Sequence, residues 1–202
     1  MQFHFNKLKI SILGLEMKKI FYILLIAVLS SCAAVDHSSR NETVSKLIQE
    51  QQWEITNDWA FPLTTTSTNI MYNAGLIPPG STGNRINLIG NTNYVKKVGD
   101  SISVYLPFFG DRQFGGGYNT GNSAIAFDGI PKNLNTLETR KSELKKYRIE
   151  FKEGTESYRG ILIIYNNGTT EMTIYGSHRS SMRYTGHLKK LELLKTKNIV
   201  SN

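Results

Sequence analysis

The sequence YRGILIIY at residues 158–165, followed by NNG at 166–168, decides the fold that the chain predicts. Its four central residues, 161–164, are all apolar and show no alternation, which is typical of a strand in the middle of a sheet, covered on both faces. Asn167-Gly168 favours a tight hairpin turn, because these residues accept the positive φ that a primed turn requires. The stretch therefore predicts one strand of an antiparallel sheet and the turn into the next strand.

Alternating apolar residues predict further strands on both sides of this hairpin. The strand before it alternates apolar with charged residues, which predicts one buried and one wet face. Glu153-Gly154-Thr155 is expected to turn that strand into the next, and residues 181–186 supply one more strand after the hairpin. The apolar positions of the two flanking strands are Tyr147, Ile149 and Phe151 before the hairpin, and Met172 and Ile174 after it.

The first half of the chain predicts one longer hairpin and several shorter strands. Residues 98–101 form its turn, and the apolar residues that follow at period two are expected to share one face of a strand. Residues 53–61 indicate a strand interrupted by Asn57-Asp58 and stopped by Pro62, and residues 63–85 read as a loop. The remaining expected strands cover residues 70–72, 85–88, 94–95 and 124–127, and the period-two residues after the turn are Ile102, Val104, Leu106 and Phe108.

Three segments are expected to be helical. Ser39 and Glu42 fit a capping box, so an amphipathic helix is expected to follow and to end near Gln52. A helical turn is expected around Leu137, and a short terminal helix is expected from Leu188, Leu191 and Leu194. Together the elements predict a mainly β fold, an antiparallel sandwich or a partly open barrel of about seven to nine strands with an N-terminal helix.

The segment from Met17 to Cys32 is typical of a lipoprotein signal peptide. Two lysines precede an apolar run at 20–29, which is about half of the roughly 20 residues that a membrane-spanning helix needs. The sequence LSSC at 29–32 matches a lipobox, in which Cys32 is acylated and becomes the new N-terminus. Cys32 is also the one cysteine of the chain. Met17, followed by two lysines, is the predicted true start, and the alternative is a longer leader that begins at Met1. The alternative for Cys32 is a buried or accidental thiol.

These signals predict four regions along the chain. They are a signal peptide at 1–31, a lipidated tether at 32–38, a single β-rich domain at 39–194 and a frayed tail at 195–202. Ala33 is not the aspartate that retains lipoproteins in the inner membrane, and no acidic surface-export cluster follows Cys32. We therefore expect an outer-membrane lipoprotein of the cell envelope that faces the periplasm.

The charge of the chain limits its partners. The net charge is +8, of which the four lysines and one glutamate before Cys32 contribute +3, so the mature chain carries +5. Its basic residues are scattered and form no stripe interleaved with aromatic residues, so we expect no nucleic-acid partner. The basic excess favours contact with anionic lipid headgroups or acidic polysaccharide, or simply forms a solvated surface.

The order of these signals resembles a known family. The most specific pieces are Leu-Pro-Phe-Phe-Gly at 106–110 and Tyr-Thr-Gly at 184–186, preceded by Arg179 and Arg183. With the lipobox, the helix and the strand pattern, residues 40–190 resemble a family of lipoproteins from Bacteroidetes, the domain of unknown function DUF4251. The resemblance implies an envelope lipoprotein with a compact, mainly β domain, and it implies no catalytic residue.

Motifs for catalysis are weak in this sequence. It contains no zinc-protease, nucleophile-elbow or phosphate-loop motif and no cysteine pair, so we expect no cofactor and no metal site. His178 and His187, nine residues apart, are weak candidates for a zinc-binding pair, because they lack an acidic neighbour in sequence. Asp111 and Asp128 flank a glycine-rich loop, and two carboxylates at a rim suit glycoside hydrolysis. The alternative to these roles is an ordinary turn aspartate and surface histidines.

Two groups of residues are candidates for ligand binding. Arg179 and Arg183 are expected to bind an anionic ligand, or to be two exposed arginines on a strand. Aromatic residues around the glycine-rich loop are expected to line a groove for a small apolar or sugar-like ligand, although core packing also explains Phe108. This aromatic set comprises Phe108, Phe109, Phe114 and Tyr118.

The sequence therefore favours a non-catalytic ligand-binding or interaction module that is tethered to the membrane through Cys32. A small envelope hydrolase using Asp111, Asp128 or His178 is the first alternative, and it predicts these side chains in one cleft. A structural accessory of an outer-membrane complex is the second alternative, and it predicts an exposed apolar patch and no cavity.

Overall fold

The computed structural model describes residues 37–63, 66–113, 124–141 and 143–192, which form two helices and a β-sheet. Helix α2 (His37–Glu50) precedes the first strand, and helix α3 (Thr66–Asn73) lies between β1 and β2. Neither helix is long and apolar enough to cross a membrane. The strands are β1 (Gln52–Pro62), β2 (Ile86–Asn87), β3 (Tyr94–Val98), β4 (Ser101–Pro107), β5 (Ala124–Gly129), β6 (Asn133–Thr136), β7 (Glu143–Glu153), β8 (Glu156–Tyr165), β9 (Thr169–Gly176) and β10 (Met182–Lys190).

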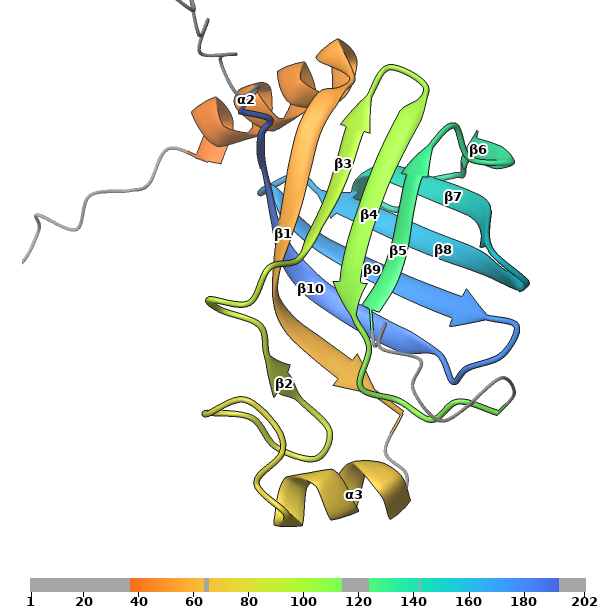
Figure 1. The fold of residues 1–202 in the computed structure, drawn as a ribbon. Coiled ribbons are helices and arrows are strands. Elements are labelled where there is room, and N and C mark those ends of the chain that lie inside the picture. The colour runs from red at the N-terminus through yellow and green to blue at the C-terminus, as the bar shows by residue number, and fades with distance from the viewer. Residues whose placement is uncertain (1–36, 64–65, 114–123, 142, 193–202) are drawn as a thin grey trace, which may run out of the picture. The chain divides into compact units, whose positions relative to one another are not determined.

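All described strands belong to one antiparallel sheet. Its order is β5-β4-β3-β1-β10-β9-β8-β7-β6, and the two-residue strand β2 pairs with β1 beyond the end of β3. Figure 1 shows that the sheet curls, so that β5 at one end comes to lie in front of β7 and β8 near the other end. The mainly β fold is confirmed. Of the two predicted architectures, the structure has the partly open barrel.

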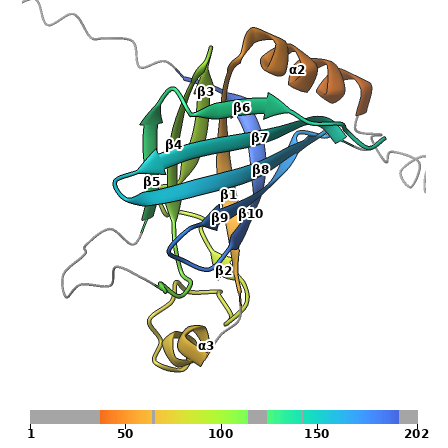
Figure 2. The same ribbon diagram turned by 90° about the vertical axis from the view of Figure 1, so that its right-hand side faces the viewer.

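The barrel is closed by side chains along the seam between β5 and β7. The ring of Phe127 on β5 stacks on the ring of Phe151 on β7, with centroids 4.7 Å apart. The backbone N–H of Ala126 donates a hydrogen bond to the carboxylate of Glu153, at 3.3 Å. Figure 2 shows the β7–β8 hairpin reaching toward β5. Strand pairing thus ends at this seam, and aromatic packing continues in its place.

The core lies inside the curl of the sheet, because alternate residues of each strand point inward. Burial of a large apolar side chain stabilises the fold by about 1.5–3 kcal/mol, so these residues are the main source of stability. The largest fully buried side chains are Trp53, Ile55, Ile86, Leu88, Ile102, Leu106, Ile125, Ile149, Leu162, Ile164, Met172 and Tyr184.

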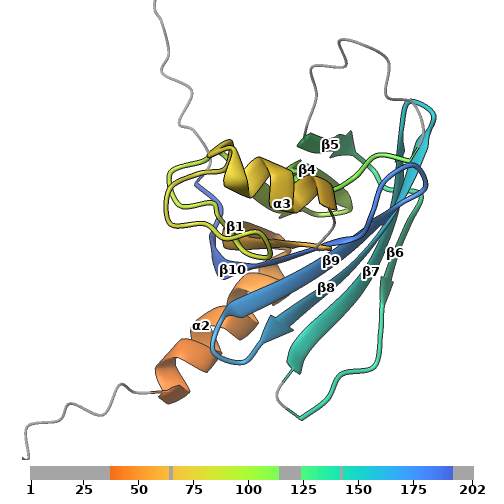
Figure 3. The ribbon, with the colours of Figure 1, turned by 90° about the horizontal axis from the view of Figure 1, so that it is seen from below.

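Helix α2 covers one end of the barrel, as Figures 1 and 3 show. Its apolar face buries Val44 and Leu47 against the sheet, as the spacing predicted. The helix starts at His37, two residues before the start that the predicted capping box at Ser39 indicated. The predicted hairpin turn lies beneath it. Gly168 has a φ of +79°, and a Cβ atom there would lie 3.1 Å from the Cγ2 atom of Val44.

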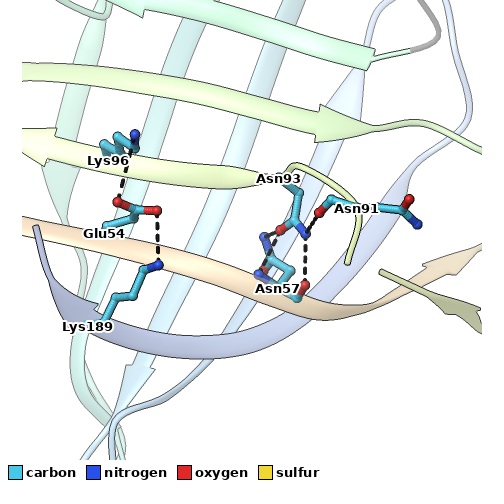
Figure 4. A network of polar contacts seen from close by, with 6 residues as sticks. All are labelled: Glu54, Asn57, Asn91, Asn93, Lys96 and Lys189. Carbon is cyan, nitrogen blue, oxygen red and sulfur yellow. Dashed lines mark hydrogen bonds and ion pairs between the residues drawn. The ribbon is translucent and has the colours of Figure 1, made fainter. Parts of the chain in front are cut away.

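A β-bulge bends β1 at the place where the sequence breaks its alternation. The pairing of β1 with β10 shifts register between Asn57 and Trp59. On the other side of β1, the side chain of Asn93 replaces a strand residue. Its Oδ1 accepts a hydrogen bond from the Asn57 backbone N–H at 2.7 Å, and its Nδ2 donates to the Asn57 carbonyl at 2.9 Å (Figure 4). The outward side of β1 holds Glu54 between two lysines, Lys96 at 3.8 Å and Lys189 at 3.3 Å.

Four further predictions of local structure were wrong. Residues 70–72 lie in helix α3, where the Ala74 N–H bonds the Ile70 carbonyl at 2.9 Å and no sheet pairing is made. The segment around Leu137 follows β6, because residues 133–136 pair with β7. Leu188 continues β10, which pairs with β1 as far as Lys190. Strand β8 buries one face only, since Ile161 and Ile163 on its outer face are partly exposed.

Candidate functional site

One end of the barrel brings together the two most specific pieces of the sequence. The Ser180 N–H bonds the Asp111 carbonyl at 2.9 Å, and the Gln113 N–H bonds the His178 carbonyl at 2.8 Å. The hydroxyl of Tyr184 donates to the Pro107 carbonyl at 2.8 Å. Residues 107–113 and 178–184 therefore form one unit.

Gly110 fits closely into this packing. A Cβ atom at position 110 would lie 2.7 Å from the Cζ atom of Phe108, and it would also overlap the Ser180 hydroxyl. Real Cβ atoms do not approach other atoms this closely, so a larger residue at position 110 would require the Phe108 ring and the Ser180 hydroxyl to move. The glycine of Leu-Pro-Phe-Phe-Gly thus has a packing role.

Arg179 is the centre of the unit and is 6 % exposed. Its guanidinium binds the carboxylate of Glu156 through two hydrogen bonds, Nε to Oε1 at 2.8 Å and Nη2 to Oε2 at 2.7 Å. It also lies between two aromatic rings, 4.8 Å from the centroid of Phe108 and 5.4 Å from that of Tyr158. Nη1 is buried without a hydrogen-bond partner. Nε and Nη2 are both bonded to Glu156, so the geometry favours a structural role for Arg179.

The ionisation of the cluster follows from its contacts. Burial opposes ionisation of Glu156, but the hydrogen bonds from Arg179 and Tyr158 outweigh it and hold the pKa of this carboxyl below its ordinary value. Burial, with the hydrogen bond to Glu156, raises the pKa of the Tyr158 hydroxyl. The pair therefore stays charged, and Tyr158 stays neutral, over the physiological pH range.

Of the predicted ligand-binding residues, the structure brings Phe108 and Arg179 into contact and places Arg183 elsewhere. Phe108 is part of the core, Phe109 packs against it, and Arg183 lies apart from Arg179, with its guanidinium 4.2 Å above the Phe61 ring and 3.3 Å from Glu171. Arg179 is buried, in contrast to the alternative of two exposed arginines. Phe114, Tyr118 and Cys32, the predicted lipidation site, lie outside the described residues.

The predicted catalytic residues are also divided. Asp111 and His178 lie on the two paired segments of the barrel end, whereas Asp128 lies on the outward side of β5, opposite Ser103 of β4. His187 has an acidic partner that the sequence did not indicate, Asp58, with the Nε2 and Oδ2 atoms 3.2 Å apart. Among the described residues, no group of three or more histidine or carboxylate side chains could hold a metal ion.

Asp128 lines a groove that was not predicted from the sequence. This shallow groove, of about 470 Å³, crosses the seam on the outer face of the barrel, and we call it the tyrosine groove. Tyr94 and Tyr105 stand opposite each other on β3 and β4, with ring centroids 5.9 Å apart. Small residues flank Tyr105, because Ser103 and Ala126 are its neighbours on the same face. The groove is lined by Tyr94, Tyr105, Ser103, Asp128, Lys152 and Glu153.

One signal in the sequence could have indicated this groove. Ile102, Val104 and Leu106 point inward, so Tyr105 falls at an outward position, where it is 37 % exposed. An aromatic residue at a wet position of a strand is informative, because alternation predicts a polar residue there. The second wall could not have been found this way, since Lys152 and Glu153 belong to the distant strand β7.

Comparison with known proteins identifies the domain. A family model described as a domain of unknown function, DUF4251, matches residues 36–188. The chain belongs to the DUF4251 family. The crystal structure of a DUF4251 family protein from Bacteroides eggerthii DSM 20697 is similar, with 14 % sequence identity and a TM-score of 0.49. The match covers 76 % of this chain and 89 % of that chain. No match is found among curated proteins.

The match confirms that the domain is of the DUF4251 type predicted from the sequence, and its span includes both specific motifs. In this DUF4251 domain the motifs shape the barrel end. Gly110 and Tyr184 allow the contact between the loop and the turn, and Phe108 packs on Arg179. The tyrosine groove lies apart from the motifs, on the outer face of β4 and β5.

Proposed function

We propose that this DUF4251 protein is a lipid-anchored, non-catalytic binding protein of the cell envelope, and that the tyrosine groove holds its ligand. The lipobox that ends at Cys32 supports the anchor, because its cysteine follows a charged and then a short apolar segment. Ala33 after the acylated cysteine favours the outer membrane, with the domain facing the periplasm.

The observation that carries the binding role is the stacked pair Tyr94–Tyr105 beside a floor of small residues. Aromatic rings supply a large contact area on two rotatable bonds, so a ligand that packs on them costs little side-chain entropy. Tyr105 has small neighbours, Ser103 and Ala126, on the adjacent rows, which leave one side of its ring open to the groove.

The other groups of the groove define the ligand's chemistry. Ser103 offers a hydroxyl, Asp128 a carboxylate acceptor and Lys152 an ammonium donor, all within the same groove. A ligand with an apolar ring face and hydroxyl groups at its edge satisfies both kinds of contact. We therefore propose a sugar-like ligand, as the sequence suggested, but at the tyrosine groove and not at the glycine-rich loop.

Titration of the mature chain with neutral trisaccharides tests this proposal. Maltotriose, cellotriose and the methyl ester of trigalacturonic acid are suitable probes, and chemical-shift changes in the NMR spectrum report the binding site. Binding is expected to move the signals of residues in β4 and β5. Tyr105→Ala is expected to weaken binding about tenfold, since an aromatic contact contributes about 1–2 kcal/mol.

The matched control is Tyr72→Ala, which removes another exposed tyrosine, on helix α3 and outside the groove. The control is expected to bind like the unmodified chain. Equal binding by the Tyr105 and Tyr72 variants, or shifts confined to other parts of the domain, would overturn the assignment of the groove.

A further inference from the structure

A second groove opens next to the tyrosine groove, on the outer face of β7, β8 and β9. Its volume is about 490 Å³, and we call it the basic groove. Lys152 lines both grooves, so the two are adjacent at the end of β7. The residues of the basic groove that matter here are Lys132, Lys152, Arg159, Glu150, Tyr175 and Ser157.

The basic groove carries an excess of positive charge. Three of its side chains are cationic, Lys132, Lys152 and Arg159, and one is a carboxylate. That carboxylate, Glu150, already accepts hydrogen bonds from Asn133 at 2.8 Å and from the Nε atom of Arg159 at 3.2 Å. The two remaining nitrogens of the Arg159 fork lie on a side chain that is 64 % exposed, so they are accessible to a second anion.

The surroundings have the same sign. Residues 132–159 contain eight basic and five acidic side chains, and so carry +3 of the charge of the mature chain. The sequence left open whether the basic excess serves an anionic partner or a solvated surface. The excess that bears on the groove is local, because three cations line it against one carboxylate, and this excess attracts anions.

We infer that the ligand is an acidic saccharide that spans both grooves. One sugar ring packs on Tyr105, and a carboxylate of the next sugar binds Lys152, Lys132 and the Arg159 fork. This inference rests on the proposed function of the tyrosine groove. The polar lining favours a saccharide over a lipid acyl chain, because Ser103 and Ser157 offer hydroxyl groups and Asp128 offers an acceptor. Tyr175, which is 50 % exposed, supplies a second aromatic surface in the basic groove.

Paired probes that differ only in charge test the inference. Trigalacturonic acid is compared with its methyl ester, and a hyaluronan hexasaccharide with its methyl ester, using isothermal titration of the mature chain with Cys32→Ser. The acids are expected to bind about tenfold more tightly than the esters at about 0.01 M salt, and the difference is expected to vanish near 1 M, where the Debye length falls to about 3 Å. Lys132→Gln with Arg159→Gln is expected to remove the same difference.

Lys141→Gln with Lys145→Gln is the matched control, because it removes two charges from the same region outside both grooves, and it is expected to preserve the preference for the acid.

Equal binding of acid and ester overturns this inference and leaves the proposed function standing. A preference for the acid that is unaffected by Tyr105→Ala supports the anion site and overturns the tyrosine groove. Failure of all four probes to bind overturns both, and so does a preference for anionic lipid vesicles over every probe.

Discussion

Gly186 of β10 lies against the bulge of β1 so closely that a Cβ atom at position 186 would be 2.5 Å from the Cα atom of Asn57. The clash would be with backbone, which cannot move aside as a flexible side chain can. Gly186→Ala is therefore expected to destabilise the domain by at least about 3 kcal/mol, as severe overpacking does. Urea unfolding monitored by circular dichroism measures the change. Thr185→Ala, one residue away, is the control and is expected to cost less than about 1 kcal/mol; equal losses would contradict the steric explanation.

The side chain of Asn93 is expected to stabilise the same bulge. Asn93→Ala leaves the backbone N–H and carbonyl of Asn57 without the partners they have in the fold, at a cost of about 3 kcal/mol. Asn91→Ala removes a nearby exposed amide and is expected to change the free energy of unfolding by less than about 0.5 kcal/mol. The same unfolding measurement distinguishes them. A loss below about 1 kcal/mol for Asn93→Ala would show that water replaces its hydrogen bonds.

The Glu156–Arg179 pair is expected to make the free energy of unfolding depend on pH in the acidic range. The pKa of Glu156 in the folded state lies below its ordinary value of 4.5, so the unfolded chain takes up its proton first as the pH falls. The contribution of the pair is therefore complete above about pH 4.5 and is lost progressively as the pH falls toward the folded pKa.

Glu156→Gln is expected to destabilise the domain by about 3–5 kcal/mol at neutral pH, because it leaves a buried guanidinium without its counter-ion. Below pH 4.5, the stability of this variant is also expected to fall less steeply with decreasing pH than that of the unaltered chain. Glu171→Gln breaks the more exposed pair with Arg183 and is expected to cost about 0–1 kcal/mol. The measurement is the free energy of unfolding as a function of pH, and an unchanged acid slope in Glu156→Gln would refute the assignment.

The seam is expected to depend on Phe127. Phe127→Ala removes the stack with Phe151, which holds β5 against β7 where no strand pairing connects them. Hydrogen exchange is expected to quicken in β5 and to stay unchanged in β8, which has paired neighbours on both sides. Tyr105→Ala, on the outer face of the neighbouring strand β4, is the control. Equal acceleration in β5 and β8 would indicate global destabilisation in place of local opening.

Acylation of Cys32 is expected to hold the protein at the membrane. Mass spectrometry of the protein extracted from membranes is expected to find an N-terminus at Cys32 with two or three acyl chains. Cys32→Ala is expected to leave the protein uncleaved and unmodified. An intact, unmodified N-terminus in the unaltered chain would refute the anchor, and with it the envelope location.

The strands were predictable because burial of one sheet face imposes a period of two. Ile102, Val104 and Leu106 show this period directly, and Asn167-Gly168 fixed the turn between β8 and β9. Helix α3 was missed, because a short apolar segment such as 70–72 fits a strand or a helix equally well. The partner decides between them, and none of the sheet strands pairs there.

The sites were less predictable, because they join residues that are far apart in the chain. Arg179 was identified, but its burial depends on Glu156, which lies 23 residues upstream. The tyrosine groove forms only where β7 approaches β5. At that seam the two strands are held by the Phe127–Phe151 stack and by the hydrogen bond from the Ala126 N–H to Glu153. Nothing local in the sequence marks that long-range closure.

The hydrogen bond from the Ala126 N–H to Glu153 also affects the tendency of these molecules to aggregate at high concentration. An unpaired strand edge is a template for another chain, and edge-to-edge addition is a common start of aggregation. The free edge of β5 presents the Ala126 N–H to the carboxylate of Glu153, so an incoming strand must displace a charged group to pair there. At the other end of the sheet, β6 offers only four residues. An open barrel thereby keeps both of its ends unsuited to growing into a fibril.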